Sequence, residues 1–282
     1  MELSNESFDQ MATQLSMLAD KYHDYELPQV SIVIPAFNCA QNISATLDSV
    51  LKQNYPNFEL VVVESGSIDR TLEIIESYQD SRIHIYSVPI GQRYEMINKG
   101  ISQSRGAYIN FLFPGDFYIH QNTLKYMMSL ALENPEARLV YCGTLLREGR
   151  TEVKVLFRSL SIDLLRRGQQ PTSLQSIWFR QDVFKEIGKF NTSLQLRGGY
   201  ELLCRFCLHE NLKTASTSRV LIDYDLRWVT KWMVIRHFFE TMQIVHQYFG
   251  FWATVRWLFI QKDTLRFTKL WWRSVKVAFY GR

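Results

Sequence analysis

The feature that most constrains the fold is an alternation, between residues 30 and 113, of short β-branched runs with segments whose apolar residues recur at helical spacing. The run 30–35, VSIVIP, is followed by Ile43, Leu47 and Val50, which this spacing places on one face of a helix. Strands that alternate with helices form right-handed βαβ units, so we predict a mainly parallel, Rossmann-like α/β sheet flanked by helices. The expected strands cover 30–35, 58–63, 82–88 and 107–113, and the expected helices cover 43–51, 72–78 and 94–102.

The second half of the sequence gives weaker signals, with strands expected near 139–142, 176–179 and 214–222 and a helix over 200–209. A length of 282 residues fits one large domain with an appendage, at roughly 100 to 200 residues per domain. We therefore predict an N-terminal helical extension and linker over 1–28, an α/β domain over 29–225 and a helical tail over 226–282. Helices are expected over 8–20, 230–248, 251–260 and 264–279.

The tail concentrates basic and aromatic residues. Residues 227–282 carry ten Lys and Arg against two acidic residues, and they contain six of the seven tryptophans. The longest uncharged stretch, 241–255, is shorter than the roughly 18 to 20 residues that a membrane-spanning helix needs. Helices of this composition suit an anionic bilayer surface. The alternative is that they pack on the domain or on a partner subunit and that their charges face solvent.

Other properties of the chain exclude several classes. A net charge of +4 is too small to indicate nucleic-acid binding, and no RNA-binding motif is present. The acidic N-terminus lacks a secretory signal pattern, so we expect a cytoplasmic protein, with the tail at the inner face of the membrane. Cys204 and Cys207 form a C-x-x-C without a second pair, which favours buried structural thiols over a zinc site.

Polar residues follow the predicted strands at the points where the strands end. They are Asn38, the segment 64–67 (ESGS) and the segment 114–116 (PGD). Parallel sheets bind ligands beyond the carboxyl ends of their strands, so these positions are the first candidates for a site. Neither G-x-G-x-x-G after the first strand nor a P-loop motif occurs, which excludes the usual dinucleotide and P-loop sites.

Six stretches in order resemble the family 2 glycosyltransferases, inverting enzymes with a GT-A fold that use nucleotide sugars. Residues 63–71 (VESGSIDRT) are similar to the family's V-D-D-G-S-x-D-G-T, and residues 106–116 (GAYINFLFPGD) to its G-x-[YW]-I-x-F-L-N-S-D-D. The other stretches are 30–38 (VSIVIPAFN), 94–100 (YEMINKG), 175–180 (QSIWFR) and 188–205, with GKFN and YELLCR at its ends. The resemblance covers about 30–222 and implies a GT-A domain with a C-terminal helical extension.

The resemblance implies a site for the donor and for a divalent cation, Mn²⁺ or Mg²⁺. Asp116 would hold the cation, because such cations are held by one or two carboxylates together with substrate phosphates. Gln175 and Arg205 would line the acceptor and diphosphate side. The implied nucleotide-binding residues are Pro35, Phe37, Asn38, Glu64, Ser65, Arg93, Asn98 and Asp116. Structural alternatives are an Asx turn at Asp116, a solvated acid at Glu64, a turn-closing Asn38, a surface charge at Arg93 and a salt bridge at Arg205.

Two glycines depart from the family pattern. Gly115 stands where the family often has the first Asp of its metal-binding pair, and Gly199 stands where the family has the general base. Glu201 is the candidate replacement for that base, although two residues along a helix turn a side chain by roughly 200°. Alternatively, Glu201 occupies the first turn of a helix, where the dipole favours a negative charge.

These residues predict an inverting, metal-dependent transferase. It would move a sugar from a nucleotide diphosphate sugar, with UDP favoured, to a glycan or lipid-linked acceptor in polysaccharide or cell-envelope biosynthesis. The alternative prediction, based on Gly115 and Gly199, is a donor-binding or assembly protein that keeps the fold without turnover.

Overall fold

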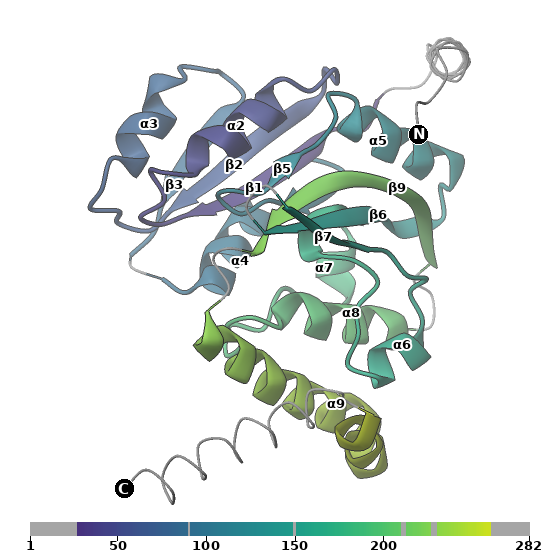
Figure 1. Ribbon diagram of the computed structural model, residues 1–282. Helices are drawn as coiled ribbons and strands as arrows, with labels where there is room; N and C mark the ends of the chain where they lie inside the picture. The colour runs from purple at the N-terminus through teal and green to yellow at the C-terminus, as the bar shows by residue number, and fades with distance from the viewer. Residues whose placement is uncertain (1–26, 90, 149–150, 210–212, 227–229, 261–282) are drawn as a thin grey trace, which may run out of the picture.

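The computed structural model describes residues 27–89, 91–148, 151–209, 213–226 and 230–260, and their strands form one mixed sheet (Figure 1). The strand order is β3-β2-β1-β4-β8-β6-β9-β5, with β7 paired to β6. Strands β3, β2, β1 and β4 are parallel, whereas β8 runs antiparallel to both of its neighbours. The strands are β1 (Val30–Ala36), β2 (Phe58–Glu64), β3 (Ile83–Ser87), β4 (Tyr108–Phe111), β5 (Phe117–Tyr118), β6 (Ala137–Glu148), β7 (Thr151–Leu156), β8 (Ile177–Arg180) and β9 (Lys213–Asp225).

Helices cover both faces of the sheet, with α2, α3 and α5 on one face and α4, α7, α8 and α9 on the other (Figure 1). The helices are α2 (Ile43–Leu51), α3 (Thr71–Ser77), α4 (Arg93–Gln103), α5 (Thr123–Glu133), α6 (Ile162–Arg166), α7 (Val183–Glu186), α8 (Gly198–Leu208) and α9 (Lys231–Ile260), with a 3₁₀ turn η1 (Leu174–Ser176). The layered arrangement places the carboxyl ends of β1, β2 and β4 at one edge of the sheet.

The two helical layers explain why the first strands are continuously apolar. Along β1, Ile32 and Ile34 point into the core under α2, while Val33 points into the core under α4. All three side chains are fully buried. A strand that is buried on both faces needs apolar residues at every position, and β-branched residues pack well there.

The predicted elements of the first half are found, and α2 has the predicted bounds 43–51. The second half differs more. The strand expected at 139–142 extends over 137–148, and the strand expected at 214–222 extends over 213–225. The added residues 143–148 of β6 pass from buried to exposed and end in Arg147 and Glu148, so no apolar run marks them. The residues added at the end of β9 include Asp223 and Asp225, which are polar although they are buried. The sequence did not predict β5, β7, α5, α6 or α7, and the helices expected at 8–20 and 264–279 lie outside the described residues.

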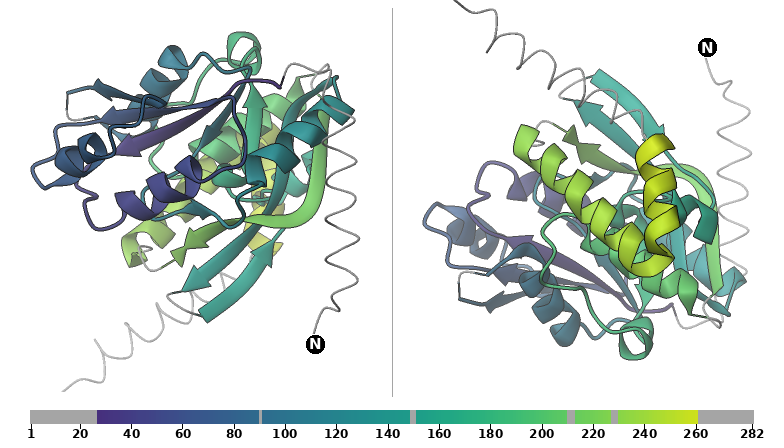
Figure 2. Two further views of the ribbon diagram at one scale, coloured as in Figure 1. Left: turned by 90° about the horizontal axis from the view of Figure 1, so that it is seen from above. Right: turned by 90° about the horizontal axis from the view of Figure 1, so that it is seen from below.

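The described part of the tail is a single bent element, α9. Its backbone leaves helical geometry at Gly250, with φ 82° and ψ −180°, a region that only glycine occupies readily. Figure 2 shows the two limbs of α9 meeting at this bend and crossing the lower face of the molecule. Ile244, Val245 and Trp257 of α9 are buried in the core shared with α4 and α8. None of the helices in the described ranges is both long and apolar enough to cross a membrane.

The four cysteines are free thiols, and Cys142 and Cys204 are buried. Burial raises the pKa of Cys142, Cys204 and Cys207 to about 12. These three side chains therefore remain neutral thiols at physiological pH, as expected of structural cysteines rather than of metal ligands or nucleophiles.

Candidate functional site

A cavity of about 280 Å³ lies where the segments after β4 and β9 meet the loops before α8. It is partly open to solvent, and polar and aromatic side chains share its wall. The first turns of α9 close one side through Met233 and His237. The other lining residues are Arg93, Tyr94, Phe113, Pro114, Asp116, Gln170, Ser173, Leu174, Gln175, Leu196, Arg197, Gly199, Tyr200, Tyr224 and Asp225.

Asp116 is a buried carboxylate on the cavity wall, with only 4 % of its surface exposed. The side-chain amide of Gln175 donates to its Oδ2 at 2.5 Å, and the backbone N–H of Asp225 also donates to the carboxylate. Burial raises the pKa of Asp116 to about 7, although both hydrogen bonds act in the opposite direction. The structure thus brings together Asp116 and Gln175, two residues that the sequence predicted for one site.

Asp225 is a second acidic residue on the cavity wall that the sequence analysis did not identify. It is buried and ends β9, where Arg147 Nη2 lies 3.6 Å from its carboxylate. The main partner of Arg147 is Asp223, whose two oxygens lie 2.9 and 3.0 Å from Nε. Asp223 and Asp225 alternate at the end of a predicted strand, and this signal was present in the sequence.

Two arginines face the same cavity. Arg93 begins α4, and its guanidinium lies 4.7 Å from the centre of the Phe113 ring. Arg197, which sequence reasoning also missed, is 5 % exposed and lies 4.0 Å above the Tyr200 ring. Its Nη1 donates to Gln170 and its Nη2 to the Gly168 carbonyl, whereas its buried Nε has no partner among the described residues.

A carboxylate of α9 holds the loop that carries Arg197. Glu240 accepts hydrogen bonds from the backbone N–H groups of Gln195, Leu196 and Arg197, each at 2.9 Å. Burial alone raises the pKa of Glu240, but these bonds and the one from Arg236 outweigh it and lower the pKa below its ordinary value. The loop before α8 is therefore fixed by the C-terminal helix.

A separate polar cluster joins the ends of β1 and β2. Asn38, at φ 45°, receives a hydrogen bond from the Ile68 N–H and donates its own N–H to Ser67. Glu64 accepts from the N–H groups of Gly66 and Ser67. Burial raises the pKa of Glu64, but the hydrogen bonds together lower it below its ordinary value. Pro35 is buried at the end of β1, and Phe37, next to Asn38, is 43 % exposed.

Ser65 ties this cluster to the segment before α4. Its hydroxyl accepts from the Gly91 N–H at 2.7 Å and donates to the Pro89 carbonyl at 3.2 Å. Arg93 follows two residues later and faces the cavity. The cluster of Asn38, Glu64 and Ser65 thus borders the segment that leads to the cavity but does not line the cavity itself.

The sequence of the region that carries most of these residues identifies the family of this chain. A model described as Glycosyl transferase family 2 matches residues 31–188. The chain belongs to glycosyl transferase family 2. An uncharacterized glycosyltransferase of Rickettsia typhi is 30 % identical over 189 residues, 64 % of this chain and 58 % of that protein. A PGL/p-HBAD biosynthesis glycosyltransferase of Mycobacterium bovis is 27 % identical over 201 residues, 70 % of this chain and 77 % of that protein.

Solved structures show the same fold. S. aureus TarS 1–349 in complex with UDP-GlcNAc has a TM-score of 0.64 at 20 % identity, over 78 % of this chain and 66 % of that one. The mannosyltransferase PcManGT of Pyrobaculum calidifontis, in complex with GDP-Man and Mn²⁺, has a TM-score of 0.61 at 16 % identity, over 89 % and 83 % of the two chains. The predicted GT-A fold is confirmed.

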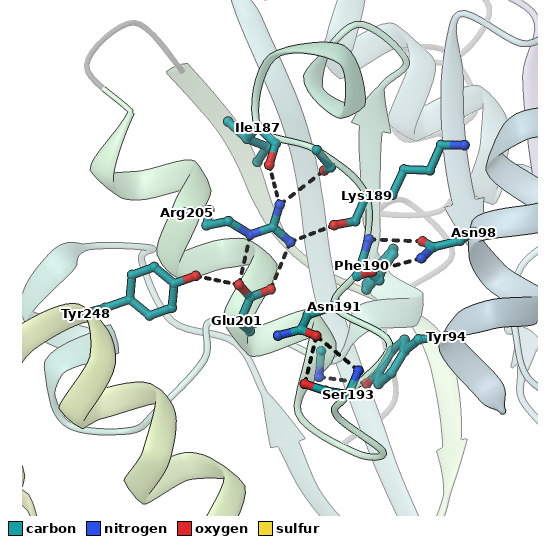
Figure 3. Close-up of polar contacts among 12 residues, drawn as sticks. Tyr94, Asn98, Ile187, Lys189, Phe190, Asn191, Ser193, Glu201, Arg205 and Tyr248 are labelled. Carbon is teal, nitrogen blue, oxygen red and sulfur yellow. Dashed lines mark hydrogen bonds and ion pairs between the residues drawn. The ribbon is translucent and has the colours of Figure 1, made fainter.

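Glu201 of this family 2 chain lies between α8 and α9, where it forms an ion pair with Arg205 and a hydrogen bond with Tyr248 (Figure 3). Its two oxygens accept from Nε and Nη2 of Arg205 at 2.9 and 2.8 Å, and Oη of Tyr248 donates to it at 2.5 Å. Arg205 also donates to the carbonyls of Ile187 and Lys189. Neither Glu201 nor Arg205 lines the cavity. This arrangement matches the salt-bridge alternative for Arg205 and leaves Glu201 without access to the cavity.

Asn98 is also occupied elsewhere. Its amide donates to the Phe190 carbonyl at 2.8 Å and accepts from the Phe190 N–H at 2.9 Å, so it joins α4 to the segment before α8 (Figure 3). At the position of the family's general base, Gly199 contributes bare backbone to the cavity wall. A Cβ there would meet Leu174 at 3.3 Å. The structure therefore brings no carboxylate to the cavity from the first turn of α8.

The cavity suits a hard divalent cation only in part. The described residues contain no group of three or more His, Cys, Asp or Glu side chains that could hold a metal ion by themselves. Asp116 and Asp225 are the two carboxylates that line the cavity. Mg²⁺ and similar cations take one or two carboxylates and complete their shell with substrate phosphates and water. The donor set therefore fits a cation that binds together with a diphosphate.

Proposed function

We propose that this chain is an inverting glycosyltransferase that moves a sugar from a nucleoside diphosphate sugar to a hydroxyl of a glycan or lipid-linked acceptor. The observation that carries the proposal is the pairing of Asp116 with Gln175 in a cavity that also presents Arg93 and Arg197. Carboxylate and arginine side chains on one wall are suited to a ligand whose diphosphate carries negative charge and binds with a cation.

The donor would bind along the edge formed by β1, β2 and β4. Arg93 and Arg197 would pair with the diphosphate, and the unpartnered Nε of Arg197 supplies a donor for it. Asn38, Glu64 and Ser65, which border this edge, would receive the nucleoside. Uridine is supported by the structural neighbour TarS, which was solved with UDP-GlcNAc.

Asp116 and Asp225 would hold Mn²⁺ or Mg²⁺. When bound, the cation acts as a Lewis acid that stabilises the negative charge developing on the departing diphosphate. Asp225 would supply from β9 the second carboxylate that Gly115 cannot supply from the β4 segment. Gln175 orients the Asp116 carboxylate through the hydrogen bond at 2.5 Å, and the Asp225 N–H fixes it from another side. Ligands held in this way need little reorganisation when the donor binds.

The acceptor is proposed to belong to cell-envelope or polysaccharide biosynthesis, at the cytoplasmic side of the membrane. The M. bovis relative, whose name places it in PGL/p-HBAD biosynthesis, supports this proposal. The acceptor would contact the apolar part of the cavity lining, to which Gly199, Leu174 and Met233 contribute. A wall of this kind suits an acceptor with an apolar portion.

One observation favours a second candidate, a donor-binding or assembly protein without turnover. An inverting transferase needs a group that accepts the proton of the incoming hydroxyl. In this chain Gly199 occupies the family's base position, and Glu201 is held by Arg205 and Tyr248 away from the cavity. Besides Asp116 and Asp225, the described lining contains His237 as a proton acceptor, but burial lowers the pKa of this imidazole to about 3, which makes it a weak base.

A donor panel separates the two candidates. The full chain is incubated with UDP-, GDP- and TDP-sugars, with and without Mn²⁺, and release of nucleoside diphosphate is measured beside direct binding of the same donors. We expect metal-dependent binding and slow release with at least one UDP-sugar. Metal-dependent binding without any release, also in the presence of lipid-phosphate and glycan acceptors, favours the second candidate, and the absence of binding contradicts both.

A further inference from the structure

A second, smaller cavity of about 160 Å³ lies between α6 and the second limb of α9, away from the site described above. Its lining is dominated by three arginines: Arg166 and Arg167 at the end of α6, and Arg256 of α9. All three are exposed, and the remaining lining residues are Asp163, Ala253 and Trp257. We call this the arginine groove.

The arginine groove carries an excess of positive charge. Asp163 is its one acidic lining residue and pairs with Arg166, whose Nη1 lies 3.2 Å from Oδ1. Three arginines and one aspartate give the lining residues a formal charge of +2. Arg256 forms no ion pair with any residue in the described ranges. Several arginines that line one groove are suited to a phosphate, because each guanidinium group can donate two hydrogen bonds to it.

Large aromatic side chains are exposed beside the groove. Trp252 is 80 % exposed and Phe259 is 85 % exposed, and both share the helix face of Arg256 because they lie four residues before it and three after it. Phe251 packs edge-to-face on Trp252, with 5.5 Å between the ring centres. We call these three residues the aromatic face. Exposed rings beside phosphate-binding arginines are the arrangement in which rings enter a bilayer interface while the cations contact lipid headgroups.

The kink at Gly250 produces this arrangement. It turns the second limb so that Trp257 is buried at 3 % exposure while Arg256, one residue earlier, faces α6 and the groove. The first limb of the same helix lines the larger cavity through Met233 and His237. Figure 2 shows both limbs on one side of the molecule. Helix α9 thus joins the larger cavity to the arginine groove.

We propose that the arginine groove and the aromatic face together form a binding site for anionic phospholipid headgroups at a bilayer surface. The charge of the groove selects the phosphate, and the aromatic face enters the interface beside it. Among possible occupants, a bilayer surface satisfies both features at once, and the sequence after residue 260 continues with six Lys and Arg against one acidic residue. The proposal does not depend on the transferase activity, because no residue of the larger cavity takes part in it.

Flotation with vesicles tests the proposal. The full chain is mixed with neutral phosphatidylcholine vesicles or with anionic vesicles that also contain about 30 mol% phosphatidylglycerol. Each basic residue near an anionic surface contributes roughly fivefold to binding. We therefore expect R166Q/R167Q/R256Q to lower the partition coefficient on anionic vesicles by about 100-fold. W252S/F259S is expected to lower it as well, and wild type is expected to bind anionic vesicles far better than neutral ones.

The matched control is K52Q/K185Q/K213Q, which also removes three positive charges from exposed side chains. Its partition coefficient is expected to fall by less than about fivefold, because these charges lie outside the groove. Thermal unfolding establishes that each variant is folded, and W252S/F259S serves if the arginine variant is not. Equal binding by the two triple variants would overturn the proposal. Wild-type binding to anionic vesicles that inorganic phosphate abolishes would also overturn the proposal. So would W252S/F259S binding to these vesicles as strongly as wild type, whether or not the aromatic face instead contacts a second copy of the chain.

Discussion

At the residue scale, the site depends on carboxylates in unlike surroundings. At Asp116 the cost of burying a charge outweighs the two hydrogen bonds to the carboxylate, so its pKa rises to about 7. Glu64 and Glu240 are buried where backbone N–H groups surround them, so their pKa values fall. A carboxyl group with a raised pKa at a cavity wall is typical of a functional position. Hydrogen bonds from N–H groups keep a carboxylate ionised, and at Glu240 they also hold the loop before α8.

Asp116→Asn tests the functional reading of that residue. The amide keeps the shape of the side chain and its hydrogen bond with Gln175 but removes the charge that a cation needs. We expect the Mn²⁺-dependent part of UDP binding to fall at least roughly tenfold, measured by titration calorimetry with and without Mn²⁺. Asp163→Asn, at an exposed position outside the larger cavity, is the control. Unchanged metal-dependent binding in Asp116→Asn would show that another residue holds the cation.

Glu201→Gln separates a general base from a structural ion pair. Glu201 is almost fully buried, and its loss leaves the Arg205 guanidinium without its carboxylate. Breaking a buried ion pair in this way costs about 3 kcal/mol of stability, which urea unfolding measures. We expect that loss together with an unchanged turnover number for donor at a temperature where the variant stays folded. A large fall in turnover without a loss of stability would restore Glu201 as the base.

At the element scale, α9 shapes the site from a distance in sequence. Glu240 holds the loop 195–197, Tyr248 donates a hydrogen bond to Glu201, and Met233 forms part of the cavity wall. These contacts connect α8 and α9 through polar groups as well as through the buried Ile244 and Val245. The position of the loop before α8 is therefore set by a helix that begins some thirty residues later.

Glu240→Gln is expected to show the pH dependence of this connection. The pKa of Glu240 is lower in the folded protein than its ordinary value, so the carboxylate stabilises the fold above about pH 4.5 and this contribution is lost as the pH falls through the folded pKa. At pH 7 the variant should be less stable by about 1 to 3 kcal/mol, because an amide accepts fewer of the three N–H groups. The difference between the two proteins should shrink in urea unfolding below pH 4. A difference that stays the same from pH 7 down through the acid range below pH 4 would contradict the ionic contribution.

At the scale of the whole molecule, the tail is continuous with the α/β domain in the described structure. The predicted division at residues 225 and 226 places α9 outside the domain, yet Ile244, Val245 and Trp257 are buried in its core. The packing of α9 on the domain matches one of the two predictions for the tail, and contact with a bilayer surface stays a proposal. One face packs on the domain, and the other carries the exposed aromatic side chains.

Truncation measures this dependence. A chain that ends at Asp225 should lose cooperative thermal unfolding and aggregate on size exclusion, because its core would expose the apolar surface that α9 covers. A chain that ends at Ile260 keeps every described contact of α9 and should unfold cooperatively. If the chain ending at Asp225 is monomeric and as stable as the longer chain, the tail is an independent part, as the division at 225 and 226 predicts.

The sequence by itself determined the α/β class, the first four strands, the polar edge and the family, because each of these depends on local periodicity and on short motifs. Strands buried on both faces must be apolar throughout, so 30–35 and 58–63 could be identified without neighbours. The Asp116 position followed from its place at the end of a strand. The full length of β6 and β9 could not be identified, because 145–148 of β6 and 213–220 of β9 are exposed or half-buried and do not form apolar runs.

Only the tertiary structure decided which polar side chains share a cavity. Asp225 and Arg197 join Asp116 from segments about 110 and 80 residues away, whereas Glu201, Arg205 and Asn98 satisfy one another or nearby backbone groups. A motif specifies the type and order of its residues, but the direction of a side chain depends on which partners its helix meets. Those partners come from α9 and from the segment 187–190, whose contacts no local pattern encodes.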